Sequence, residues 1–69
     1  MRAIKKEFVD SVAAACDLSK REARQEIMSA AKYLRELQDL RDLVLDDIDE
    51  ALYDMGVEPD FAEDLLEMI

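Results

Sequence analysis

Apolar side chains recur every three to four positions near the start of the chain. The positions concerned are Ile4, Phe8, Val9, Val12, Ala15 and Cys16. This spacing places them on one side of a helical wheel and predicts an amphipathic helix over residues 3–16. Cys16 belongs to the apolar stripe, so we expect its thiol to be part of the core.

A second helix is predicted directly after the first. Asp17 and Leu18 interrupt the pattern, and Ser19 with Glu22 forms the S-x-x-E signature of a capping box. A helix over 20–38 follows, and its inner face consists of Ala23, Ile27, Ala30, Leu34 and Leu37. Because only a short turn separates the two helices, they should pack as a helical hairpin.

The apolar pattern continues through the second half of the chain. Its positions are Leu40, Leu43, Val44, Ile48, Ala51, Leu52 and Met55. They predict a third helix from Asp39 to Met55, with Gly56 as a left-handed cap. A helix running on from residue 20 would be long for a small domain, so we expect a break near Gln38.

A short fourth helix is predicted at the end of the sequence. Pro59 suits the first turn of a helix, and either Glu58 or Asp60 suits the cap. The apolar contacts expected for this helix are Phe61, Leu65, Met68 and Ile69.

Composition agrees with a helical chain. The 69 residues are 51% hydrophobic and include one Gly and one Pro. No strand-like alternation is present, so we expect one all-α domain over 1–69 with three to four helices. It would comprise a helical hairpin (1–38) and an acidic helical half (39–69). A core this small would gain from dimerisation, and the sequence leaves open whether a homodimer forms.

Charge divides the chain into two unequal halves. Residues 1–38 hold eight Lys and Arg against six Asp and Glu, a net charge of +2. Residues 39–69 hold one base, Arg41, against twelve acids, a net charge of −11. The total of −9 argues against direct binding to nucleic acid or to an anionic membrane, and favours a positively charged partner.

The residues that carry most enzyme chemistry are missing. The sequence has no His and a single Cys, which excludes a disulfide framework, a zinc-ligand cluster and His-based catalysis. The acids also lack the spacing of a calcium-binding loop. We therefore expect no enzyme activity, no cofactor and no metal. No stretch reads as a signal peptide or a membrane span, so we expect a cytoplasmic protein.

The acids of the second half are predicted to form a partner-binding face. On a continuous helix, seven carboxylates from Asp39 to Asp54 would span about 22 Å, a density close to one DNA phosphate per about 3.4 Å of strand. The predicted partner-binding residues are Asp39, Asp42, Asp46, Asp49, Glu50, Tyr53, Asp54, Glu58, Asp60, Glu63 and Asp64. Asp47 falls near the apolar stripe, so it either pairs with a base or marks an error in the assumed register.

The acids have two plainer interpretations. They could form a solvated face that confers solubility, but like charges four residues apart cost a few tenths of a kcal/mol each, and a solubilising face normally mixes both signs. Alternatively, bases of the second helix could neutralise them. Only four are available for twelve acids, namely Arg21, Arg24, Lys32 and Arg35.

Residues 6–37 resemble the N-terminal helix-turn-helix of the bacterial HU and integration-host-factor histone-like proteins. The first helix matches at Lys6, Glu7, Phe8, Val9, Val12 and Ala13, and the turn matches at Leu18, Ser19, Lys20, Arg21, Glu22 and Ala23. Further apolar matches are Ile27, Ala31 and Leu34, although Ala31 is smaller than the aromatic residue of the family.

The resemblance stops before the DNA-binding part of that family. There, the hairpin forms an intertwined dimer body, and a sheet with basic arms grips DNA. Here no Gly-Phe-Gly turn, strand or basic arm follows Leu37, so DNA binding does not carry over. The resemblance implies shared ancestry of the helical half, or an ability to engage an HU-type dimer.

Considered whole, the chain resembles small acidic phage proteins that mimic DNA and disable host DNA-binding proteins. That resemblance implies an inhibitor covering the basic DNA-binding surface of an HU-type nucleoid protein in the bacterial cytoplasm. One alternative is an HU-like dimerisation or adaptor protein acting through its hairpin. Another is an antitoxin or an acidic regulator of the transcription machinery.

Overall fold

Helices joined by short connections make up the computed structural model, which describes residues 4–69. The helices are α1 (Lys6–Cys16), α2 (Lys20–Leu40), α3 (Leu45–Asp54), the 3-10 turn η1 (Pro59–Phe61) and α4 (Ala62–Leu66). No strand occurs within the described residues. The predicted all-α class is therefore confirmed.

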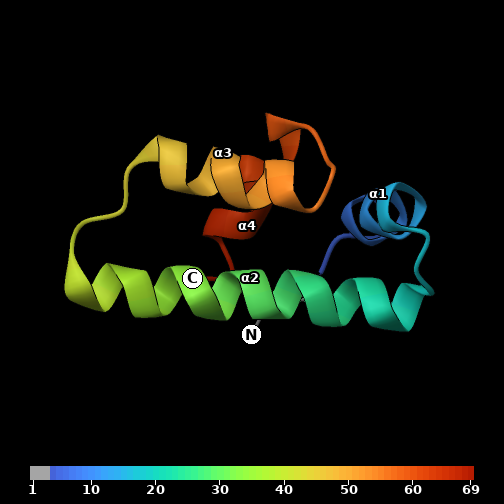
Figure 1. Cartoon of the computed structure of the whole chain (residues 1–69), viewed down its shortest axis with the longest axis horizontal. Helices are drawn as coiled ribbons and strands as arrows, with labels where there is room; N and C mark the ends of the chain where they lie inside the picture. Colours follow the sequence, from blue (N-terminus) through green and yellow to red (C-terminus); the bar gives the residue numbers. More distant parts are fainter. Residues whose placement is uncertain (1–3) are drawn as a thin grey trace.

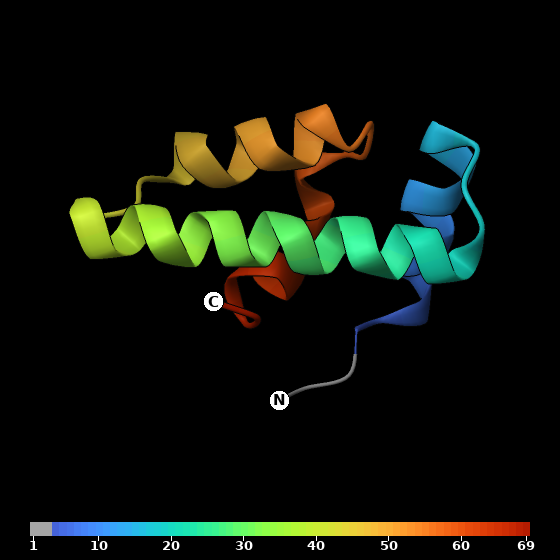
Figure 2. The same cartoon turned by 60° about the horizontal axis from the view of Figure 1, so that its bottom comes forward.

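The long helix α2 is the platform on which the other elements rest (Figure 1). α1 crosses the N-terminal end of α2, and α3 lies along the C-terminal part of α2 (Figure 2). α4 packs against both α2 and α3. The resulting body measures 33 × 22 × 15 Å.

The hairpin turn between α1 and α2 contains the predicted capping box. The Ser19 hydroxyl accepts a hydrogen bond from the Glu22 backbone N–H at 3.1 Å, and the Glu22 carboxylate accepts one from the Ser19 N–H at 3.2 Å. These bonds satisfy two N–H groups that a helix start leaves unpaired. Asp17 closes α1 in the left-handed region, with φ at 54°.

All four α-helices contribute to one core. The buried residues are Phe8, Val9, Val12, Ala23, Ile27, Ala31, Leu34, Ile48, Leu52, Met55 and Leu65. The half-buried Phe61 ring stacks on Phe8, with ring centroids 4.9 Å apart and planes 6° from parallel. The last segment therefore covers the apolar side of the hairpin.

The boundary between the second and third helices differs from the prediction. α2 continues through Gln38 to Leu40, and α3 begins only at Leu45. Leu40 and Val44 consequently lie outside the core, with 84% and 53% of their surface exposed. The four-residue connection 41–44 is fixed by an ion pair described below, which periodicity alone does not reveal.

The end of α1 also differs from the prediction. Ala15 and Cys16 are exposed, so Cys16 is not a core thiol. Its Sγ–H donates to the Met55 backbone carbonyl at 3.3 Å, because the last turn of α1 packs against the loop after α3 instead of the core. The helix begins at Lys6, and residue 3, where we expected its start, lies outside the described residues.

The end of α3 follows the predicted pattern. Gly56 adopts φ 74°, the Gly56 N–H donates to the Tyr53 carbonyl at 2.9 Å, and the Val57 N–H donates to the Leu52 carbonyl at 3.1 Å. These bonds form a Schellman motif, which satisfies carbonyls at the helix end.

The last segment begins as predicted at Pro59, although as a 3-10 turn before α4. Glu58 occupies its cap position without a side-chain hydrogen bond. Leu65 is buried, and Met68 and Ile69 are half-buried. Within residues 4–69, no helix combines the length and apolar character needed to cross a membrane.

Candidate functional site

Ten of the predicted partner-binding residues are carboxylates, and we call them the acidic surface. They are Asp39, Asp42, Asp46, Asp49, Glu50, Asp54, Glu58, Asp60, Glu63 and Asp64. None is buried: Asp49 and Asp64 are half-buried and the others are exposed. Among residues 4–69, none of the ten side chains forms a hydrogen bond or an ion pair. Their negative charge is therefore available to a partner.

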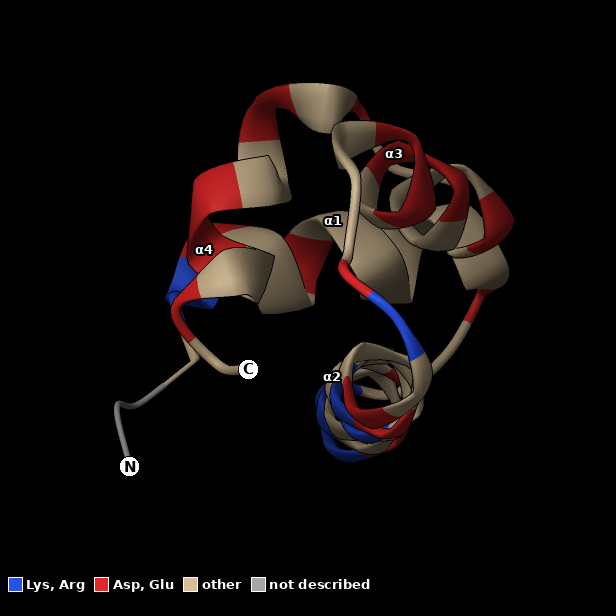
Figure 3. Ribbon diagram, turned by 90° about the vertical axis from the view of Figure 1, so that its left-hand side faces the viewer, with Lys and Arg blue, Asp and Glu red and all other residues tan. Residues whose placement is uncertain are grey.

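The centre of the acidic surface is the outward side of α3 (Figure 3). At about 100° per residue, the half-buried Asp49 lies on a flank of α3. Asp46, Glu50 and Asp54 lie on the side opposite the buried Ile48 and Leu52. Tyr53 projects from the same side and is 81% exposed. The structure thus brings together five of the eleven predicted residues on one helix.

The other predicted residues lie on different elements, which corrects the expected geometry. Asp39 belongs to α2 and Asp42 to the connection, whereas Glu58, Asp60, Glu63 and Asp64 lie beyond the turn at Gly56. α3 has ten residues, a rise of about 15 Å. A straight rod of seven carboxylates over about 22 Å is therefore wrong. The acids are spread over the end of α2, the connection 41–44, α3 and the segment after Gly56, and not along one straight helix.

Asp47 makes the specific ion pair that holds the corner between α2 and α3. Arg41 donates two hydrogen bonds to it, from Nη1 to Oδ2 at 2.9 Å and from Nη2 to Oδ1 at 2.7 Å. Asp47 Oδ2 also accepts from the Val44 N–H at 3.0 Å, which caps the first turn of α3. The expected alternative that Asp47 pairs with a base is confirmed.

The pKa values of this pair follow from its hydrogen bonds. The Arg41 side chain, and then the Val44 N–H, hold the pKa of Asp47 below its usual value. The same hydrogen bond and the charge of Asp47 raise the pKa of Arg41. Arg41 is the one base of residues 39–69, so its engagement with Asp47 leaves the acidic surface without a cation of its own.

The bases of α2 lie away from the acidic surface. Arg21, Arg24, Lys32 and Arg35 fall within about 80° of arc, on the flank of α2 that faces away from α3 (Figure 3). Within residues 4–69 none of the four forms an ion pair, and Arg35 donates instead to the Met68 carbonyl at 3.4 Å. The structure therefore gives no support to internal neutralisation by α2.

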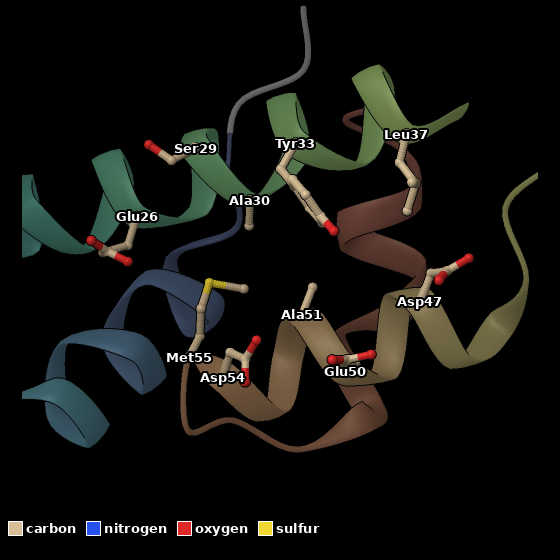
Figure 4. Close-up of a pocket in the computed structure, with 10 residues that line it drawn as sticks. All are labelled: Glu26, Ser29, Ala30, Tyr33, Leu37, Asp47, Glu50, Ala51, Asp54 and Met55. Carbon is tan, nitrogen blue, oxygen red and sulfur yellow. The ribbon is translucent and has the colours of Figure 1, made fainter. Parts of the chain in front are cut away.

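A groove of about 330 Å³ separates α2 from α3, and we call it the α2–α3 groove (Figure 4). Its lining consists of Glu26, Ser29, Ala30, Tyr33 and Leu37 from α2, and of Asp47, Glu50, Ala51, Asp54 and Met55 from α3 and its end. Sequence reasoning missed Glu26 and Tyr33 as site residues. Their seven-residue spacing on one helix face, beside Ala30 and Leu37, is the signal that could have found them.

Clustered carboxylates can also hold a metal ion. In the part of the chain that the structure describes, no three His, Cys, Asp or Glu side chains come together as a metal site would require. The arrangement is instead suited to holding positive charge over an extended surface.

Comparisons with known proteins give no relative from which function could be transferred. No family model, no curated protein and no solved structure matches this chain. Function is therefore inferred from the acidic surface and its surroundings.

Proposed function

We propose that the protein is a DNA-mimicking inhibitor whose acidic surface covers the basic DNA-binding surface of an HU-type nucleoid protein. One observation carries the proposal: ten carboxylates, eight exposed and two half-buried, have no internal partner among the described residues, while the bases of α2 face elsewhere. A surface that served only solubility would gain free energy by interleaving Lys with its acids.

Electrostatics supply the mechanism. Carboxylates take the place of phosphates opposite Lys and Arg of the target, and the net charge of −9 steers the two proteins together. Salt screens exposed charges beyond about 8 Å at physiological ionic strength, so the association should weaken as salt rises. Because both ligands use the same bases, the inhibitor and DNA compete directly.

The choice of an HU-type target comes from the resemblance of residues 6–37 to that family. A phage origin and action at the nucleoid in the bacterial cytoplasm come from the resemblance of the whole chain to small acidic phage inhibitors. Both belong to the proposal and are tested with it.

The adaptor alternative needs an apolar hairpin face free for dimerisation. Phe8, Ile27 and Leu34 are fully buried within one chain, and Phe61 stacks on Phe8. Because the chain's own last segment covers the apolar face of the hairpin, we favour the acidic surface over the hairpin as the partner-binding face.

Binding to a purified HU-type protein tests the proposal. At about 50 mM salt we expect a complex by titration calorimetry, and at about 500 mM we expect it to be lost. Absence of binding at low salt would contradict the HU-type target. Binding that is unaffected by high salt would contradict the electrostatic mechanism.

A matched pair of triple variants locates the interaction. Asp42→Asn, Asp46→Asn and Asp49→Asn together should weaken binding about tenfold, since each exposed pair contributes about 0.5 kcal/mol. The control, Glu7→Gln with Asp17→Asn and Glu36→Gln, changes the net charge equally but on the hairpin, and should alter binding about twofold at most. Equal losses in both variants would show that net charge, and not the acidic surface, determines binding.

A further inference from the structure

The α2–α3 groove joins an apolar floor to a negatively charged rim. Ala30 and Leu37 of α2 face Ala51 and Met55 across it, and the Tyr33 ring projects into it from α2 (Figure 4). Tyr33 is 61% exposed, so its ring is accessible beside the apolar floor. The groove therefore offers both apolar and aromatic surface to a ligand.

Charge in the groove is one-sided. Of its four carboxylates, Asp47 is paired with Arg41, whereas Glu26, Glu50 and Asp54 form no ion pair among residues 4–69. Arg41, the base beside the groove, is engaged by Asp47, and the bases of α2 lie on the opposite flank of that helix. A ligand that fills the groove without carrying positive charge would leave this excess negative charge uncompensated.

We propose that the α2–α3 groove binds an arginine side chain of the basic partner. Its guanidinium would lie against the Tyr33 ring and donate to the carboxylates of Glu26, Glu50 and Asp54, while its aliphatic stem covers the apolar floor. This inference rests on the proposed function only in taking the partner to be a basic protein.

The guanidinium group favours arginine over lysine, whereas the aliphatic stem and the size of the groove suit a long basic side chain of either kind. The planar guanidinium stacks on aromatic rings and donates to two carboxylate oxygens at once, whereas an ammonium group is a compact, strongly hydrated charge. Its three-carbon stem can pack on apolar surface while the charged head stays at the rim. A groove of about 330 Å³ is at the small end of ligand sites, a size suited to a side chain.

A peptide titration tests this without any HU-type protein. The probe is a synthetic peptide with arginines separated by alanine and leucine, and its twin carries lysine at each arginine position. Binding is followed by the amide NMR shifts of the full chain. The arginine peptide should change the amide shifts of Glu26, Tyr33, Glu50 and Asp54 most strongly. We expect the lysine twin to bind about fivefold more weakly, because it loses the stacked and bidentate contacts.

The two exposed tyrosines provide a matched pair of variants. Tyr33→Ala should weaken binding of the arginine peptide about threefold to fivefold, the size expected of a cation–π contact, while Tyr53→Ala, on the acidic side of α3 but outside the groove, should weaken it less. Glu50→Gln should likewise weaken binding more than Glu63→Gln, which removes the same charge from α4. Both tyrosines are exposed, so neither substitution should prevent folding.

Equal effects of Tyr33→Ala and Tyr53→Ala would overturn the groove proposal, as would shift changes spread evenly over the acidic surface or equal affinity for the lysine twin. A groove that selects arginine in a protein that fails to bind HU-type proteins would contradict the proposed function alone. The two proposals therefore fail separately.

Discussion

Asp47 shows how one carboxylate can shape the surface formed by the others. It occupies the third position of α3, where its side chain accepts hydrogen bonds from both the Val44 N–H and the Arg41 guanidinium. The pair ties the first turn of α3, which carries the exposed Asp46, to Arg41 at the end of α2. From the sequence, Asp47 could be recognised as different from its neighbours, but its partner could not be chosen. Arg41 lies six residues earlier, which is not a neighbouring position on a helix.

The pH dependence of folding should reveal the Asp47 pair. Its pKa is lowered in the folded state, so the pair stabilises the fold above the unfolded pKa of about 3.9. That contribution is lost as pH falls through the lower folded pKa. In Asp47→Asn, urea unfolding should show reduced stability at pH 7 and a smaller change on acidification than in the unmodified protein. The control Asp46→Asn removes the same charge without a pair, and equal behaviour of the two variants would contradict this role.

At the scale of elements, local signals predicted the hairpin better than the helix after it. The Ser19–Glu22 capping box and the three-to-four-residue spacing placed the start of α2 correctly, because both are local interactions. The corner at 41–44 was missed because Leu40, Leu43 and Val44 continue the helical spacing without interruption. The pair of Arg41 with Asp47 bridges this connection, and such a contact exists only after the chain has turned.

Gly56 at the end of α3 gives a test at this scale. A side chain there would strain a backbone with φ 74°, and a Cβ would lie 2.9 Å from the Ala15 Cβ on α1. Gly56→Ala should therefore cost at least about 1–2 kcal/mol of unfolding free energy, measured by chemical denaturation. Ala15→Gly removes the close approach but not the strain, and by itself costs about 0.5–1 kcal/mol because Ala15 lies in α1. The loss caused by Gly56→Ala should therefore be smaller in the Ala15→Gly background than in the unmodified protein. Unchanged stability of Gly56→Ala would contradict this packing of α1 on the loop.

At the scale of the whole molecule, the acids of α3 and the bases of α2 lie on different faces. The exposure of the acids could be predicted, because a face opposite an apolar stripe must meet solvent. Their layout could not, since it depends on the corner at 41–44 and the turn at Gly56. The α2–α3 groove could not be predicted either, because Glu26 and Tyr33 come from the half of the sequence that is nearly neutral in charge.

The unpaired acids should repel one another in the folded state. Raising salt from about 20 mM to about 300 mM should therefore raise the Tm, since screening weakens that repulsion. In the triple variant Asp42→Asn, Asp46→Asn, Asp49→Asn, the Tm at low salt should be higher and its rise with salt smaller. Differential scanning calorimetry measures both quantities. A Tm that falls with salt would indicate that internal ion pairs, and not repulsion, dominate.

The most direct test of the central claim is competition with DNA. A fluorescently labelled duplex is bound to a purified HU-type protein at about 50 mM salt, and its anisotropy is followed as this protein is added. We predict that the anisotropy falls to the value of free DNA, and that the triple variant Asp42→Asn, Asp46→Asn, Asp49→Asn needs about tenfold more protein for the same effect. Anisotropy that stays constant or rises would mean that DNA is not displaced, and would contradict DNA mimicry.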